Sequence, residues 1–150
     1  MKYKIYYLII LIFATFFCTK LFSKNQQTYV NKRLVSLLIN NYIIRAEVAD
    51  NPELRTLGLM FRKNIKSNYG MLFKYKNSKN HCMWMKNTLV PLSVAFIDKN
   101  HIIINIHQMK PNDETPHCSE KSSKYAIEMK SGWFSDKKIT SGHKVYGVDD

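Results

Sequence analysis

The stretch Ile43–Glu53, with the sequence IIRAEVADNPE, contains both kinds of local structure that determine the fold. Its first seven residues are rich in aliphatic and β-branched side chains and predict a strand over 43–49. Asn51 then offers a helix cap, Pro52 suits the first helical position, and Glu53 places an acid in the first turn. We therefore expect one strand followed directly by a short helix.

Short apolar runs separated by turn residues continue through the rest of the chain. Residues 98–101 predict a hairpin turn, residues 110–124 a long polar connection, and residues 133–139 a helical turn. This pattern is mainly β (α+β) and predicts a small barrel-like or rolled antiparallel sheet with one or two short helices. The other strand candidates are Gly70–Tyr75, Cys82–Lys86, Ser93–Asp98, Ile102–His107, Tyr125–Lys130 and Lys144–Val148.

The composition of the 150-residue chain is that of an ordinary globular protein with one core, at 45% hydrophobic and 23% charged residues. The chain carries 23 Lys and Arg against 11 Asp and Glu, a net charge of +12. Only four of these basic residues are Arg, the residue type that base and phosphate recognition favours. We therefore expect no nucleic-acid partner; the charge suits anionic lipid headgroups instead.

The N-terminus has the pattern of an export signal. Lys2 and Lys4 precede an uncharged, mostly apolar run over residues 5–19, which is short for a membrane span. We interpret residues 1–24 as a signal peptide or N-terminal membrane anchor, 25–40 as a linker, and 41–150 as a single β-rich domain. The expected location is the periplasm, or the periplasmic side of the inner membrane with association through residues 5–19.

Several motifs follow one another at close spacing within the expected domain. They are GLMFR at 58–62, GMLF at 70–73, WMKNT at 84–88, Pro91-Leu92, AIE at 126–128 before Gly132, and Ser141-Gly142. This order resembles the bacterial and archaeal family called domain of unknown function 192, over residues 45–145. The resemblance implies a small β-rich domain, often exported, with no established activity. Typical members carry acids where this chain has Ser93 and His143, so no carboxylate role is carried over there.

Cys82 and Cys118 are the two cysteines outside the leader, and each follows a histidine, His81 and His117. Two cysteines in a small exported domain predict a disulfide. The alternative is a zinc or copper site that uses the neighbouring histidines. Adjacent strand residues face opposite sides of a sheet, which argues against either His-Cys pair acting as a unit. The paired doublets also resemble an exported proteobacterial branch of the family.

Methionines are frequent in the expected domain. Met83 and Met85 would share one face of a strand, and thioethers bind Cu(I), so a copper carrier that also uses His81 or His117 is an alternative. Methionine also fills irregular gaps in small cores. We favour the core interpretation and expect no cofactor.

The block Trp84-Met85-Lys86-Asn87-Thr88 before Pro91 is the main candidate binding surface. On a regular strand, Trp84, Lys86 and Thr88 would share one face and could hold a small polar or anionic ligand. The competing interpretation has Asn87 and Thr88 capping a turn, with Lys86 in solvent. Arg62 and Glu128 either join this surface or form a structural ion pair.

The expected function is that of an exported ligand-binding or envelope-associated module whose small-molecule or envelope partner is unknown. The sequence has no Gly-rich phosphate loop, nucleophile elbow or His-Glu-x-x-His motif, which makes an enzyme the less favoured class. One alternative is a small periplasmic hydrolase or lyase that uses Arg62, Lys86, Asn87 and Glu128. The other is the copper-handling protein described above.

Overall fold

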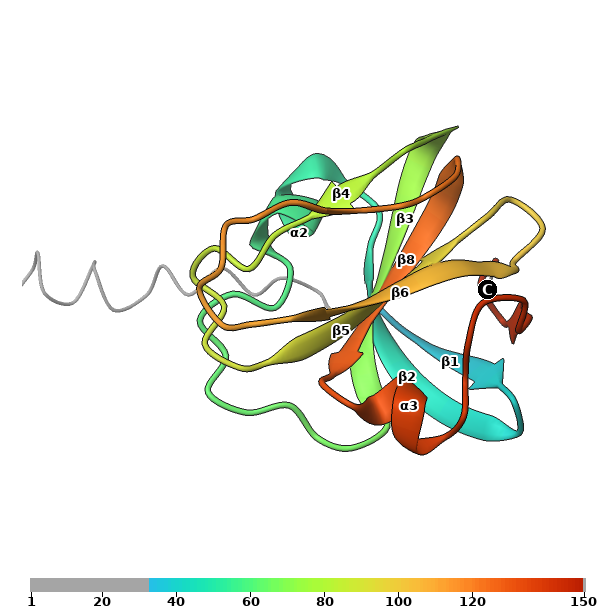
Figure 1. Ribbon diagram of the computed structural model, residues 1–150, viewed down its shortest axis with the longest axis horizontal. Coiled ribbons are helices and arrows are strands. Elements are labelled where there is room, and N and C mark those ends of the chain that lie inside the picture. The colour runs from blue at the N-terminus through green and yellow to red at the C-terminus, as the bar shows by residue number, and fades with distance from the viewer. Residues whose placement is uncertain (1–32, 150) are drawn as a thin grey trace, which may run out of the picture. The chain divides into compact units, whose positions relative to one another are not determined.

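The computed structural model describes residues 33–149, which form a curled sheet with a small accessory sheet and two short helices (Figure 1). The helices are α2 (Pro52–Leu57) and α3 (Trp133–Asp136), and the accessory sheet pairs β4 (Cys82–Met83) with β7 (His117–Cys118). The main sheet consists of β1 (Leu34–Ile39), β2 (Tyr42–Ala49), β3 (Tyr69–Lys79), β5 (Leu92–Ile97), β6 (Ile103–Met109), β8 (Ser123–Lys130) and β9 (Val145–Tyr146).

The order of the main sheet is β6-β5-β8-β3-β2-β1-β9. All pairs are antiparallel except β2 and β3, which run parallel and are connected through α2. The two edges of the sheet approach each other, because Ile102 next to β6 forms a bridge with Lys144 next to β9. The result is a curled half-barrel, which confirms the predicted fold class.

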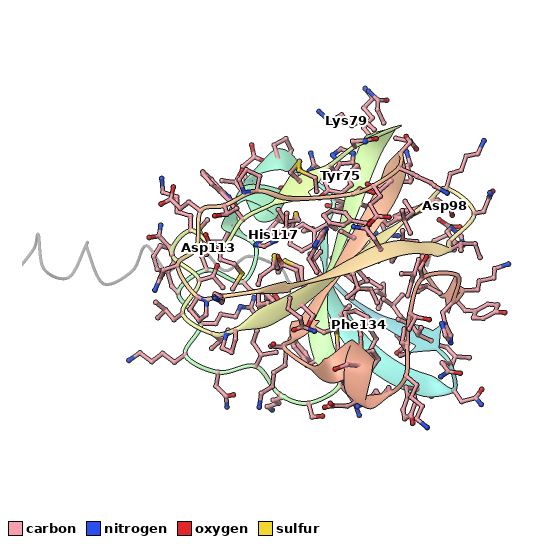
Figure 2. The ribbon with its side chains drawn as sticks, in the orientation of Figure 1. Tyr75, Lys79, Asp98, Asp113, His117 and Phe134 are labelled. Atoms are coloured by element: carbon pink, nitrogen blue, oxygen red, sulfur yellow. A yellow bond between two sulfur atoms is a disulfide. The ribbon has the colours of Figure 1, made fainter. Side chains whose placement is uncertain are left out.

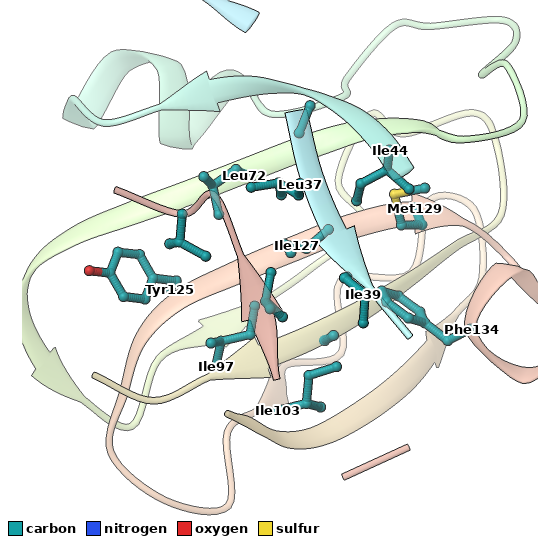
Figure 3. Packing of buried hydrophobic residues seen from close by; sticks show 14 of the residues in the cluster. Leu37, Ile39, Ile44, Leu72, Ile97, Ile103, Tyr125, Ile127, Met129 and Phe134 are labelled. Carbon is teal, nitrogen blue, oxygen red and sulfur yellow. The ribbon is translucent and has the colours of Figure 1, made fainter. Parts of the chain in front are cut away.

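Two hydrophobic clusters lie on opposite faces of this sheet. The inner cluster fills the curl and contains Leu37, Ile44, Leu72 and Ile127, with Phe134 of α3 (Figure 3). The outer cluster is built on the other face by alternate residues of the same strands, and its members include Met71, Phe73, Val94, Phe96 and Ala126. Because both faces of the central strands are covered, every residue of β5 is buried.

Local signals in the sequence explain the helix start. Asn51 caps α2, and its Oδ1 accepts a hydrogen bond from the Leu54 N–H at 2.8 Å. Pro52 occupies the first turn, where a missing N–H costs nothing. The predicted strand and helix over Ile43–Glu53 are therefore confirmed.

Three expected boundaries differ from the structure. Residues 34–39 belong to β1 rather than to a linker over 25–40, because Leu37 and Ile39 on alternate positions fill the inner core. The strand expected over Cys82–Lys86 ends at Met83, and the polar connection over 110–124 contains β7.

The leader expected over residues 1–24 and the first part of the linker lie outside the described residues. Within residues 33–149, no helix has the length and apolar character that a membrane crossing requires.

Gly70 lets β3 approach β8 closely at the centre of the sheet. Gly70 is paired with Met129, and a Cβ atom at position 70 would collide with the Glu128 carbonyl oxygen and the Met129 sulfur. The carbonyl belongs to the backbone of a central strand and has little room to move. The glycine of the GMLF motif is thus a packing requirement.

We expect Gly70→Ala to lower the free energy of unfolding by about 1–3 kcal/mol, because the methyl group overpacks the junction of β3 and β8. Chemical denaturation measures the change. Ser78→Ala, at the exposed end of the same strand, is the matched control and should change stability by under about 0.5 kcal/mol. Equal stability of the two variants would show that the strands can separate without cost.

Candidate functional site

A pocket of about 350 Å³ lies on the outer face of the sheet, and residues of α2 and the accessory strand β4 contribute to its lining. Figure 1 labels both elements. This volume is at the lower end of the range for small-molecule sites. Its wall is mixed: apolar and aromatic side chains predominate, with a few polar groups among them. The lining residues that matter for its chemistry are Arg55 of α2, Tyr75 of β3, Met83 of β4, Trp84, Thr88 and Glu128 of β8.

Glu128 is placed in this pocket by the alternation of β8. Ile127 and Met129 point into the inner cluster, so Glu128 points to the outer face, where its neighbours in the sheet are Met71 and Val94. Its residue exposure is only 4%, and among residues 33–149 no group donates a hydrogen bond to its carboxyl. Burial raises the pKa of Glu128 to about 8 and outweighs the positive charge of Arg62, which acts in the opposite direction. The group is thus a neutral carboxylic acid near pH 7.

A layer of rings and sulfur forms one wall of the pocket. The Tyr75 hydroxyl donates to the Met83 sulfur at 3.2 Å, and the His81 ring stacks on the Tyr75 ring with centroids 3.5 Å apart. Tyr75 is labelled in Figure 2. Arg55 lies over the same ring, 5.7 Å from its centroid, and donates to the Lys74 carbonyl at 3.0 Å. Burial raises the pKa of Tyr75 and lowers that of His81, so both rings are neutral at pH 7.

The Trp84–Thr88 block is a turn and not a strand, so the expected common face of Trp84, Lys86 and Thr88 does not form as predicted. Trp84 and the buried Thr88 line the pocket, whereas Lys86 and Asn87 do not. The side chain of Lys86 nevertheless lies near Trp84, with its Nζ 5.3 Å from the centroid of the Trp84 ring. Asn87 adopts a left-handed backbone with φ of 53°, a conformation that Asn tolerates well.

Arg62 is separated from Glu128 by its own ion pair. Its two terminal nitrogens contact both carboxylate oxygens of Glu47, at 2.6 and 2.7 Å, and the Tyr69 hydroxyl donates to the same carboxylate at 2.7 Å. The hydrogen bond to Glu47 raises the pKa of Arg62. An ion pair of Arg62 was one of the two expectations, but its partner is Glu47, which sequence reasoning missed.

Glu47 could have been noticed as an acid inside an apolar strand, whereas nothing in the sequence marks Tyr69 or Tyr75.

Arg62 lines a second hollow of about 640 Å³, together with Glu47 and Tyr69, and this hollow does not include Glu128. The set Arg62, Lys86, Asn87 and Glu128, expected for a hydrolase or lyase, is therefore not brought together in one pocket.

Cys82 and Cys118 form a disulfide, as the sequence predicted. They are directly opposite each other in the β4–β7 pair, so the bond closes this two-residue ladder. Cys82 is exposed and borders the pocket, which means that the disulfide holds one of the pocket walls.

The structure places the methionine and histidine candidates for a metal in different surroundings, although Met83 and His81 both contact Tyr75. Met85 is fully buried in the outer cluster, and the Met83 sulfur accepts from Tyr75. His81 covers the Tyr75 ring, whereas His117 has a buried Nε2 atom without a hydrogen-bond partner. Within residues 33–149 there is no group of three His, Cys, Asp or Glu side chains arranged to hold a metal ion.

Comparison with known proteins identifies the family. The model of domain of unknown function 192, described as an uncharacterized ACR, matches residues 35–147. The chain belongs to this family. No curated protein matches the sequence.

Two crystal structures are similar to the domain. One, from Sinorhizobium meliloti 1021, is described as a candidate transcription regulator; it is 27% identical with a TM-score of 0.76, over 78% of this chain and 95% of that one. The other is a protein of unknown function from Novosphingobium aromaticivorans DSM 12444. It is 26% identical with a TM-score of 0.75, over 79% of this chain and 89% of that one.

We expect the double variant Cys82→Ser/Cys118→Ser to fold but to lose about 3–4 kcal/mol of unfolding free energy in the loop-entropy model, since the bond spans 36 residues. The seven-stranded sheet contains neither cysteine, which is why the fold should persist. The parent protein with a dithiol reductant is the control and should show the same unfolding midpoint as the variant. Alkylation of Cys82 and Cys118 in protein trapped directly from cells would contradict a stable bond.

The buried carboxyl of Glu128 predicts a pH-dependent stability. Its folded pKa of about 8 exceeds the ordinary value of 4.5, so the folded state binds more protons between these values, and stability falls as pH rises through that window. Glu128→Gln should therefore raise the unfolding free energy at about pH 8 by about 2–4 kcal/mol and flatten the profile. Denaturation at a series of pH values measures this, with Glu114→Gln on an exposed loop as control. A parent profile as flat as that of the Gln variant would refute the raised pKa.

Proposed function

We propose that this domain of unknown function 192 protein is an exported binding module that holds one small molecule in the pocket above Glu128. The observation that carries the proposal is the carboxyl of Glu128, which lies at 4% residue exposure, opens into that pocket and has no hydrogen-bond partner among residues 33–149. Burying an unpaired polar group is costly for stability, and a ligand that pairs with it would recover part of that cost.

Export is supported by two observations. The basic start and the apolar run over residues 5–19 have the pattern of a signal segment or anchor. A disulfide with an exposed cysteine is compatible with an oxidising compartment. We therefore place the binding module in the periplasm, free or anchored to the inner membrane.

The surface does not favour nucleic acid as the partner, so the description of the Sinorhizobium protein is not carried over. Two of the four Arg side chains are held in ion pairs, Arg62 with Glu47 and Arg33 with Asp50 at 3.0 Å, and Arg55 belongs to the pocket wall. Phosphate recognition uses the free fork of a guanidinium.

Native mass spectrometry of the full-length protein, isolated without denaturation from the cells that make it, tests the proposal. We expect a bound small molecule that is released when the protein unfolds. Thr56→Trp, at an exposed α2 position bordering the pocket, should greatly reduce its occupancy because the indole blocks the opening. Glu53→Trp on the same helix, outside this pocket, is the matched control and should retain the ligand. Absence of a bound molecule, or equal occupancy in both variants, would overturn the proposal.

A further inference from the structure

Two cations of the protein already lie on the aromatic rings of the pocket. Arg55 lies over Tyr75, and Lys86 lies over Trp84, with separations of 5.7 and 5.3 Å from the ring centroids. One face of each ring is thus already occupied by a side chain that has the charge of a cationic ligand. A cationic ligand would have to enter beside both.

The interior of the pocket offers hydrogen-bond donors. Glu128 is the only acid among its lining residues, and as a carboxylic acid it donates an O–H. Arg55 uses Nη1 for the Lys74 carbonyl, and its guanidinium has further N–H donors. Thr88 donates to the Lys86 carbonyl at 3.2 Å, and Tyr75 donates to the Met83 sulfur, so these two hydroxyls are not free donors.

The groups around Glu128 favour a ligand atom that accepts a hydrogen bond from its carboxyl over one that donates to it. The neighbours in β3 and β5 are the uncharged Met71 and Val94. The titratable groups that share the pocket are Arg55 from α2 and Tyr75 from β3, while Arg62 acts from a distance and is already paired with Glu47. The net charge facing the pocket is therefore positive while Glu128 is protonated.

We infer that the ligand is a small organic monocarboxylate, whose carboxylate accepts the Glu128 O–H and faces the Arg55 guanidinium. Its hydrocarbon body would contact the apolar part of the lining, formed by Leu59, Met60, Phe73 and Met83. This inference rests on the proposed binding function and adds the chemical class of the ligand. A hydrogen bond between a carboxylic acid and a carboxylate is charge-assisted and therefore stronger than a neutral one.

Three compounds of nearly equal size and different charge test the ligand class: benzoate, benzamide and benzylamine. Binding to the full-length protein is followed by protein-observed NMR at millimolar ligand. We expect benzoate to bind at least about tenfold more tightly than benzylamine. Its affinity should fall as pH rises through about 8, because ionised Glu128 repels the carboxylate. A benzoate affinity that rises with pH, or tighter binding of benzylamine, would overturn the inference.

Variants at position 128 separate hydrogen bonding from a structural effect. Glu128→Gln keeps an N–H donor, so it should still bind benzoate and should lose the pH dependence, whereas Glu128→Leu should bind at least about tenfold more weakly. Glu114→Gln is the matched control and should behave as the parent. Loss of benzoate binding in Glu128→Gln with the fold intact would contradict the donor role.

The two proposals fail in different ways. If no benzoate binds while native mass spectrometry still finds a molecule displaced by Thr56→Trp, the carboxylate class is wrong and the binding function stands. If neither experiment finds a bound molecule, both are wrong.

Discussion

The structure depends on the central strand β8, which is paired with β3 on one side and β5 on the other. Both faces of this strand are covered, so its alternating side chains supply the two hydrophobic clusters at once. Gly70 permits the close approach of β3 that this arrangement needs. An acidic side chain on such a strand has little solvent to face, and Glu128 is the buried acid of β8.

The placement of Glu128 links fold and chemistry. Because the side chains of a strand alternate, an acid between Ile127 and Met129 has to face the outer cluster once those two fill the curl. The segments that cover the outer face, α2 and the β4–β7 pair, leave a pocket above it instead of closing over it. The disulfide matters here because β4 has only two residues, and without the bond little else in the ladder would fix this wall.

Most of the strands could be predicted from the sequence because their apolar runs are bounded by turn residues, and α2 was predicted because Asn51 and Pro52 act locally. Strand β1 was missed although residues 34–39 are an apolar run, because this run directly follows the polar stretch 23–33 and was grouped with it as a linker. Its pairing with β2 shows that Leu37 and Ile39 are core. The disulfide followed from the number of cysteines and the expected compartment. The pairing of Arg62 with Glu47 joins residues 15 positions apart on either side of α2, and no local sequence rule predicts such a contact.

Three of the candidate site residues border the same pocket. Trp84, Thr88 and Glu128 do line one pocket, but the reason given for grouping Trp84 with Thr88, a regular strand, was wrong, because Asn87 turns the chain. This turn moves Lys86 out of the lining and still lets its amine return to the face of Trp84. This amine and the Arg55 guanidinium each lie over an aromatic ring of the pocket wall, which argues against reading that wall as a cage for cations. A buried acid that stays protonated in the same pocket as a guanidinium suits an anionic ligand. The O–H of Glu128 can donate to the anion, and the positive charge of Arg55 offsets the negative charge of the ligand.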